Sequence, residues 1–386
     1  MEFPEGFRIT GLKDESTGFG LITAPCGMST AGIFTRNTVA SEPVKYCRTV
    51  IERESHRAVL VNRGSANAAT GSEGRRRMFG LLDSASSALG VEREEILHAS
   101  TGVIGMQLEY SESTLNRLFS KKDEVDPCGF AEAIMTTDTV SKTAWSSFKL
   151  GGRKITLYGA AKGAGMICPD MATMLAFIMT DADIEKKALD KALRESAALS
   201  FNALCVDGET STSDSVFLCA SGKAGNRSIG DSGSAYGSFL THLERVCLSL
   251  TEKIAADGEG ATKMIKVTVK GAPDTDCART AARAVAASPL CKTAFYGASP
   301  NWGRIISALG ASGIHVNLES FSVYVNGAAL VRNGARDPAT AEKAREVMSG
   351  GRYNLEIDLG LGREEASFYT CDLSPEYVRI NAHYIS

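Results

Sequence analysis

Strand-like segments alternate with amphipathic helical segments along this chain, and this alternation limits the possible folds more than any other feature. Strands with one or both faces buried are predicted for residues 56–62, 154–158, 264–269, 321–325, 354–359 and 366–370. The last two segments flank a short Gly-Leu-Gly-Arg stretch and therefore predict a β-hairpin.

Helices are predicted between these strands. The apolar periodicity of helices appears in residues 184–199, 235–256 and 278–287. Asp183 is the expected N-cap of the first helix. Asp337 and Pro338 are expected to open a fourth helix that Gly350 and Gly351 close. Because strict strand–helix–strand repetition is not visible, we expect an α/β fold of layered sheets and helices with mixed or mainly antiparallel strands.

Composition narrows the class of protein. The 386 residues suggest two lobes or one large α/β unit at about 150 residues per domain. The net charge of −3 excludes the basic face that nucleic-acid binding requires, and it gives no attraction to an anionic membrane. None of the ten cysteines forms a C-x-x-C pair, and residues 1–5 do not resemble a signal peptide. We therefore expect a cytoplasmic protein that binds neither nucleic acid nor membrane.

The common catalytic motifs are absent. The sequence has no phosphate-binding G-x-x-x-x-G-K-[ST] loop, no H-E-x-x-H zinc motif and no G-x-S-x-G turn. The five histidines are scattered without a pair at ligand spacing, and they are interpreted as surface or satisfied core residues. We predict no metal site.

Three glycine-containing blocks remain as candidates for chemistry. Residues 159–177 lead from a glycine-rich segment through a proline into an apolar strand that carries Thr173. Residues 99–105 place small residues and hydroxyls at the end of a probable strand, which is what an oxyanion hole requires. Residues 256–263 hold an acid between two glycines. Taken singly, the first block is equally well interpreted as a tight turn before a core strand, the second also fits a structural turn, and the third is more often a turn than a site.

Taken in order, these blocks resemble a known family. Residues 162–167 (KGAGMI) followed by 171–177 (MATMLAF) resemble the self-cleaving signature of the ornithine acetyltransferases, also called glutamate N-acetyltransferases, which include the bifunctional enzymes of arginine biosynthesis. Further matches in the same order are residues 31–35, 100–105, 135–139, 257–263, 288–290, 292–295, 300–305 and 377–382. The resemblance covers nearly the whole chain.

The resemblance implies self-cleavage between Ala172 and Thr173. An α chain, 1–172, and a β chain, 173–386, would then form one intertwined globular unit, with the layered fold of self-cleaving aminopeptidases and ornithine acetyltransferases. The new α-amine of Thr173 would serve as the base for its own hydroxyl, which explains why no catalytic histidine is needed. The family also suggests a heterotetramer of two α and two β chains.

The resemblance further implies acetyl transfer from N2-acetylornithine to glutamate through a threonine ester. Thr101 and Gly102 would hold the oxyanion beside the nucleophile Thr173. The implied substrate contacts are Thr136, Lys162, Thr173, Glu259, Asn381 and Ser386. Thr136 is preferred over Thr137 from the family spacing. No cofactor is expected, and acetyl-coenzyme A is a candidate second acetyl donor that the sequence leaves open.

Some positions depart from the family pattern, and two other functions compete with acetyl transfer. Arg63, Ser65, Asp170, Glu209 and Ser213 stand where other residues are usual. None of them removes a proposed catalytic group. The first alternative is an amidase or aminopeptidase of the same fold, in which water resolves the acyl-enzyme. The second is a non-enzymatic binding protein.

Overall fold

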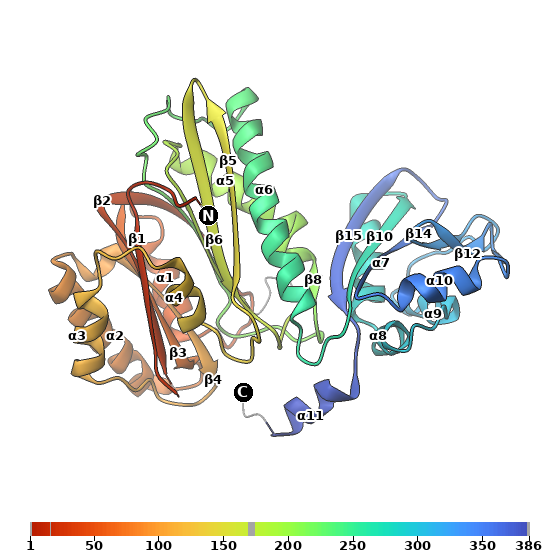
Figure 1. The fold of residues 1–386 in the computed structure, drawn as a ribbon, viewed down its shortest axis with the longest axis horizontal. Coiled ribbons are helices and arrows are strands. Elements are labelled where there is room, and N and C mark those ends of the chain that lie inside the picture. The colour runs from red at the N-terminus through yellow and green to blue at the C-terminus, as the bar shows by residue number, and fades with distance from the viewer. Residues whose placement is uncertain (1, 16, 169–173, 384–386) are drawn as a thin grey trace.

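Two β-sheets form the framework of the protein in a computed structural model that describes residues 2–15, 17–168 and 174–383 (Figure 1). The first sheet contains β1 (Arg8–Lys13), β2 (Gly18–Phe34), β3 (His56–Ser65), β4 (Ile96–Val103), β5 (Lys142–Leu150), β6 (Arg153–Lys162), β7 (Leu175–Thr180) and β9 (Ser215–Ala220). Their order is β4-β3-β2-β9-β7-β6-β5, with β1 paired to β2.

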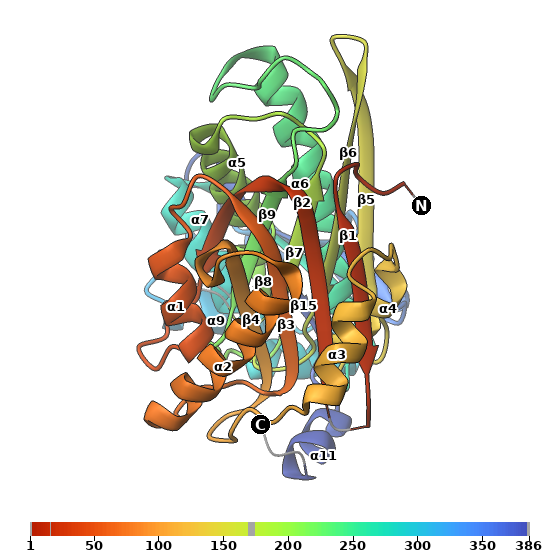
Figure 2. The same cartoon turned by 90° about the vertical axis from the view of Figure 1, so that its left-hand side faces the viewer.

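Helices cover both faces of this first sheet. One face packs against α1 (Glu42–Val50), α2 (Gly71–Leu89), α3 (Glu112–Ser120) and α4 (Pro127–Ala133). Figure 2 looks onto this face, where α1, α2 and α3 lie in front of the strands. The other face packs against α5 (Lys186–Leu199) and α6 (Gly233–Ala256). The sheet is therefore the middle of three layers.

The second sheet forms the other lobe. It contains β8 (Leu204–Cys205), β10 (Met264–Ala272), β11 (Ser322–Val325), β12 (Ala328–Arg332), β13 (Ala335–Arg336), β14 (Arg352–Asp358) and β15 (Glu364–Cys371). Their order is β13-β12-β11-β14-β10-β15-β8. The helices of this lobe are α7 (Thr275–Ala287), α8 (Pro289–Tyr296), α9 (Trp302–Ala311) and α10 (Ala341–Met348). Two short 3-10 turns, η1 (Arg93–Glu95) and η2 (Phe201–Ala203), complete the connections.

Two helices join the lobes. Helix α6 packs on the first sheet and also on the second, because Tyr369 and Cys371 of β15 belong to the same apolar core as its own Phe239 and Leu250. The last helix, α11 (Pro375–His383), leaves β15 and returns beneath the junction of the two lobes (Figure 1). At this junction, the ends of strands of the first lobe therefore lie near α11 and the other segments that follow α6.

The predicted fold class is confirmed, since helices layer on sheets that mix strand directions. β3 and β4, β7 and β9, and β10 and β14 are parallel pairs, while most other neighbours are antiparallel. Each predicted strand and the helices at 235–256 and 278–287 are present within a few residues.

The predicted hairpin of residues 354–370 is wrong. β14 and β15 are both present, but β10 lies between them. Val267 of β10 pairs with Leu355 on one side and with Phe368 on the other. Side-chain alternation identifies the buried face of a strand but not its lateral neighbours, so the short turn between the two strands was misleading.

Two predicted helix starts are also wrong. α5 begins at Lys186, because Ile184 instead forms a bridge with Ile229 and the Asp183 carbonyl accepts from the Ile229 amide at 3.0 Å. α10 begins at Ala341, because the Asp337 amide donates to the Leu330 carbonyl at 3.1 Å and keeps that segment beside β12. In both places a tertiary backbone bond holds the segment before the helix against a distant part of the chain.

Two of the histidines are core residues, as interpreted, but Nδ1 of each ring has no hydrogen-bond partner among the described residues. His56 and His98 are fully buried, and burial lowers the pKa of these imidazoles to about 4 and about 3. His98 Nε2 lies 3.0 Å from Asn62 Oδ1. Within the described part of the chain, no helix combines the length and the apolar character that crossing a membrane requires.

Candidate active site

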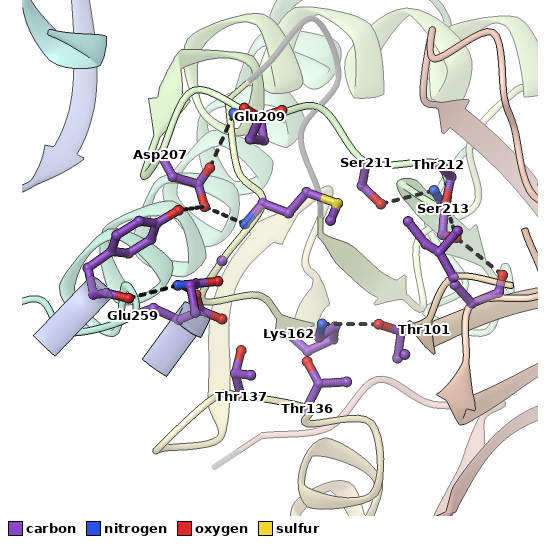
Figure 3. Close-up of a pocket in the computed structure, with 17 residues that line it drawn as sticks. Thr101, Thr136, Thr137, Lys162, Asp207, Glu209, Ser211, Thr212, Ser213 and Glu259 are labelled. Atoms are coloured by element: carbon purple, nitrogen blue, oxygen red, sulfur yellow. Dashed lines mark hydrogen bonds between the residues drawn. The ribbon is translucent and has the colours of Figure 1, made fainter. Parts of the chain in front are cut away.

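A cavity of about 290 Å³ lies where the two lobes and α11 meet (Figure 3). It gathers six of the residues singled out in the sequence: Thr101, Gly102, Thr136, Lys162, Glu259 and Asn381. Thr137 lines it as well, so the geometry leaves the choice between the two threonines a prediction. Ala172, Thr173 and Ser386 lie outside the described residues.

Thr101 and Gly102 reach the cavity from the end of β4. This strand runs parallel to β3, with Gly102 opposite Gly64. The backbones approach so closely that a Cβ on Gly102 would lie 2.3 Å from the Gly64 carbonyl carbon, and φ of Gly102 is +131°. Only glycine fits at this position, because it has no Cβ and tolerates positive φ.

Lys162 is the last residue of β6, and its side chain is buried beside Thr101 (Figure 3). Its Nζ donates to Thr101 Oγ1 at 3.1 Å. A hydroxyl can accept and donate at the same time, so this contact leaves the proton of Thr101 available for an oxygen in the cavity. The pair can thus present both a positive charge and a hydrogen-bond donor to a ligand.

Burial lowers the pKa of the Lys162 ammonium, and neighbouring charges modify that effect. The carboxylate of Asp138 acts most strongly in the opposite direction, while the like charge of Lys142 adds to the lowering. Glu259 also favours the charged form, as Asp214 does when it is ionised. The charge of Lys162 therefore depends on the acidic groups around it.

Glu259 supplies the opposite charge on the far side of the cavity. It follows α6, is 8% exposed and accepts from Asn381 Nδ2 of α11 at 2.8 Å. Its amide donates to the Ala164 carbonyl at 2.9 Å. A buried ammonium and a buried carboxylate in one cavity match a ligand that carries both charges, as amino acids do.

Asp207 forms hydrogen bonds with the chain just before residue 169. From the sequence alone, no role was predicted for it. Its carboxylate accepts from the amides of Met166 at 2.6 Å and Ile167 at 2.8 Å, and from the Tyr377 hydroxyl at 3.4 Å. Met166 has φ of +56°, which is unusual for a non-glycine residue. Asp207 and Tyr377 both line the cavity. In the sequence, the acidic Asp-Gly-Glu motif at residues 207–209 is the feature that could have indicated Asp207 as a site residue.

Asp214 holds the chain on the other side of residues 169–173. Its Oδ1 accepts from the Met174 amide at 3.0 Å, at the entrance to β7. Its Oδ2 is buried without a hydrogen-bond partner among the described residues. Burial raises the pKa of this carboxyl well above its usual range, which favours the neutral acid.

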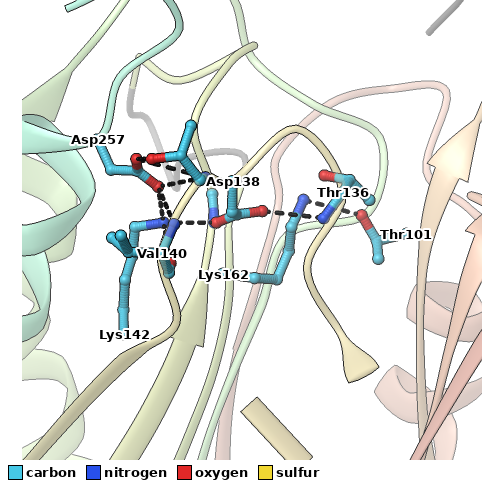
Figure 4. Close-up of polar contacts among 9 residues, drawn as sticks. Thr101, Thr136, Asp138, Val140, Lys142, Lys162 and Asp257 are labelled. Carbon is cyan, nitrogen blue, oxygen red and sulfur yellow. Dashed lines mark hydrogen bonds and ion pairs between the residues drawn. The ribbon is translucent and has the colours of Figure 1, made fainter. Parts of the chain in front are cut away.

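A buried cluster of four charged residues, Asp138, Lys142, Lys162 and Asp257, adjoins the cavity (Figure 4). Lys142 is 0% exposed, and its Nζ lies 2.6 Å from Asp138 Oδ1 and 2.5 Å from Asp257 Oδ2. The sequence reasoning placed Lys162 at the site but missed Asp138, Lys142 and Asp257. Asp138 and Asp257 belong to recognised motifs, whereas Lys142 looked like an ordinary strand residue.

The positions that depart from the family pattern lie in different places. Glu209 and Ser213 line the cavity. Arg63 donates to the Glu15 carbonyl at 3.0 Å from β3 and is not among the cavity residues. Ser65 Oγ donates to the Met106 carbonyl at 2.7 Å. Asp170 lies outside the described residues.

Comparison with known proteins agrees with the expected resemblance. The ArgJ family model matches residues 6–386. The Arginine biosynthesis bifunctional protein ArgJ of Bradyrhizobium diazoefficiens is 41% identical over 367 residues, covering 93% of this chain and 89% of that protein. The Bacillus subtilis protein of the same name is 38% identical over 386 residues, covering 99% and 95%.

A solved structure gives the same result. The crystal structure of the Arginine biosynthesis bifunctional protein ArgJ from Bacillus halodurans is 37% identical, with a TM-score of 0.51. The match covers 53% of this chain and 96% of the solved chain. The chain described here therefore belongs to the ArgJ family of enzymes.

Proposed function

We propose that this enzyme transfers the acetyl group of N2-acetylornithine to glutamate through an ester on Thr173. The observation that carries the proposal is the pairing of charges in the cavity, which buried Lys162 and buried Glu259 line together with Thr101 and Gly102. Both substrates are amino acids with a carboxylate. Such a cavity recognises their charged groups while donors nearby stabilise an oxyanion.

The proposed nucleophile forms when the chain cuts itself. The Thr173 hydroxyl attacks the Ala172 carbonyl carbon, the peptide bond shifts to an ester, and water releases residues 1–172. The freed α-amine, with an ordinary pKa of about 7.7–8.0, then serves as the base for the hydroxyl. This proposal divides the protein into an α chain, 1–172, and a β chain, 173–386.

Strand pairing across the proposed cut supports one intertwined unit. β6, which precedes the cut, pairs with β7, which follows it. β2 pairs in the same way with β9. Both products would thus share one sheet after cleavage. The solved Bacillus halodurans chain is also about half as long as this one, as one cleavage product would be.

Acetyl transfer then takes two steps. Thr173 attacks the acetyl carbonyl of N2-acetylornithine, Thr101 and the Gly102 amide hold the oxyanion, and ornithine leaves with the proton taken from the hydroxyl. The amine of glutamate next attacks the threonine ester, which yields N-acetylglutamate and restores the hydroxyl. Because ornithine leaves before glutamate attacks the covalent acetyl-enzyme, the reaction is a ping-pong transfer.

Substrate binding is proposed to use six side chains: Thr136, Lys162, Thr173, Glu259, Asn381 and Ser386. Lys162 pairs with the substrate carboxylate, and Glu259, oriented by Asn381, pairs with the ornithine side-chain ammonium. A Glu259→Gln variant tests this orientation, because it should weaken acetylornithine more than glutamate. Equal loss for both substrates would contradict a selective ammonium contact.

Three further features belong to the proposal. The relatives are named bifunctional, which supports acetyl-coenzyme A as a second acetyl donor.

The assembly is proposed to be a heterotetramer of two α and two β chains. All ten cysteines are free thiols, which supports a reducing compartment such as the cytoplasm.

A direct assay tests the proposed reaction. Purified protein is incubated with N2-acetylornithine and glutamate, and N-acetylglutamate and free acetate are quantified. The proposal expects N-acetylglutamate to form in step with ornithine. Acetate without N-acetylglutamate would instead establish hydrolysis. A parallel incubation with acetyl-coenzyme A and glutamate tests the second donor.

A further inference from the structure

The charged cluster of Asp138, Lys142, Lys162 and Asp257 is more extensive than ligand binding at Lys162 requires. Three of its members, Asp138, Lys142 and Asp257, do not line the cavity. A fully buried lysine costs several kcal/mol to desolvate unless it is paired, so Lys142 needs both of its carboxylate partners. Such an arrangement in the interior calls for a reason beyond packing.

Of the three members outside the cavity, Asp138 has the most contacts with the segments that line it (Figure 4). Its Oδ2 accepts from the Thr136 amide at 3.0 Å, and its Oδ1 accepts from the Gly163 amide at 2.6 Å. These two amides belong to the residue proposed to touch substrate and to the residue that follows Lys162. The Asp138 carboxylate, which does not line the cavity, thus connects the segments that carry Thr136 and Lys162, which do.

Asp138 also has the charge that Lys162 requires. Burial alone would raise the pKa of Asp138, but the positive charges of Lys162 and Lys142 hold it at about 2. Asp138 is therefore ionised at neutral pH. The charged groups that act most strongly on the titration of Lys162 are Asp138 before β5, Lys142 in β5, Asp214 before β9 and Glu259 after α6. Among them, Asp138 has the strongest effect toward the ammonium form.

We propose that Asp138 is a positioning residue of the transfer reaction, which keeps Lys162 in its ammonium form and fixes the Thr136 and Gly163 backbones beside it. Lys142, held in turn by Asp257, keeps the Asp138 carboxylate in place. The inference rests on the proposed function in one respect, because it takes the carboxylate of the substrate to be the binding partner of Lys162.

The titration of Lys162 tests the inference directly. The full chain is prepared with ¹³C at the lysine ε-carbons, and the Lys162 signal is assigned by its absence from a Lys162→Arg variant. Asp138→Asn should shift the Lys162 titration to lower pH. The comparison variant is Asp257→Asn, which keeps the Asp138 carboxylate and acts on Lys162 only through Lys142, so it should shift that titration less than Asp138→Asn does.

Kinetics add a second readout. At pH 8, Asp138→Asn should raise KM for acetylornithine about tenfold, with a smaller fall in kcat, because binding of the carboxylate is weakened more than the chemistry. Equal effects of the Asp138 and Asp257 variants on KM, with no shift of Lys162, would reduce Asp138 to a structural role and overturn the inference.

A variant that fails to fold and a failure of the proposed function can each be distinguished from a failure of the inference. If Asp138→Asn does not fold, Asp138→Glu is measured, and it should keep the Lys162 titration because it keeps the charge; a downward shift there contradicts the inference. If the wild-type protein transfers no acetyl group, the proposed function fails, while the Lys162 titration still decides the role of Asp138.

Discussion

The carboxyl group of Glu259 occupies the space where a side chain at Gly165 would begin. A Cβ built on Gly165 would lie 2.3 Å from the Glu259 carboxyl carbon, much closer than real Cβ atoms approach. On its other side, Glu259 accepts from Asn381 Nδ2 at 2.8 Å. The glycine segment before the proposed cut and the C-terminal helix α11 therefore fix this carboxylate together.

A Gly165→Ala substitution should displace Glu259 and weaken substrate binding. A displacement of about 1 Å at a positioning group can cost about 100-fold in activity, so we expect kcat/KM for acetylornithine to fall 10- to 100-fold. The control is Gly310→Ala in α9, where a new Cβ meets nothing within 4 Å. Steady-state kinetics of both variants should separate them, and unchanged kinetics for Gly165→Ala would contradict the close contact.

A Gly102→Ala substitution should damage the oxyanion site more than any ordinary loop change. The new Cβ would collide with Gly64 and also meet an unfavourable positive φ. Losing one oxyanion donor lowers turnover about 100- to 1,000-fold. Gly105→Ala is the matched comparison, since Gly105 has φ of +79° and open space around it. Comparable kcat values for the two variants would show that the contact with Gly64 has no role.

The pH profile of acetyl transfer should be bell-shaped. Activity rises with pH as the proposed Thr173 α-amine loses its proton, around its ordinary pKa of about 7.7–8.0. Activity falls again as Lys162 loses its proton, and this limb starts below the usual lysine range because burial lowers the pKa of Lys162. Measuring kcat/KM from pH 6 to 10.5 checks both limbs. A flat profile above pH 8 would contradict the role of Lys162.

Asp214 should control the rate of self-cleavage through its contact with Met174. Asp214→Ala removes the acceptor of the Met174 amide, which adjoins the proposed nucleophile, and we expect cleavage to slow about tenfold. Asp214→Asn keeps that acceptor and resembles the neutral acid that burial favours. It should therefore cleave nearly as fast as wild type. A time course of the precursor band distinguishes the two, and equal rates for both variants would exclude this role.

Much of the fold could be predicted from local pattern, because burial imposes a period of two on strands and of 3.6 on helices. Residues 264–269 and 235–256 were found this way. Lateral order was not, since nothing in residues 354–370 indicates that β10 separates the two strands. Helix starts failed where a distant backbone contact, such as that between the Asp337 amide and the Leu330 carbonyl, holds the predicted first residues beside another strand.

The site was predictable only as far as the resemblance reached. Lys162, Glu259 and Asn381 lie far apart in the chain, and no local pattern brings them to one cavity. Lys142 shows the limit most clearly: in sequence it is a lysine at the start of a strand, a place that normally faces water. Its burial follows from Asp138 and Asp257, and the latter is more than a hundred residues away.

The central claim is that Thr173 becomes an N-terminal nucleophile, and N-terminal sequencing of purified protein with intact mass analysis tests it most directly. We predict two polypeptides, residues 1–172 and 173–386, the second beginning with Thr173. A Thr173→Ala variant should remain a single chain without acetyl transfer. A wild-type protein that stays one chain of 40.9 kDa and still transfers acetyl groups at full rate would contradict the account.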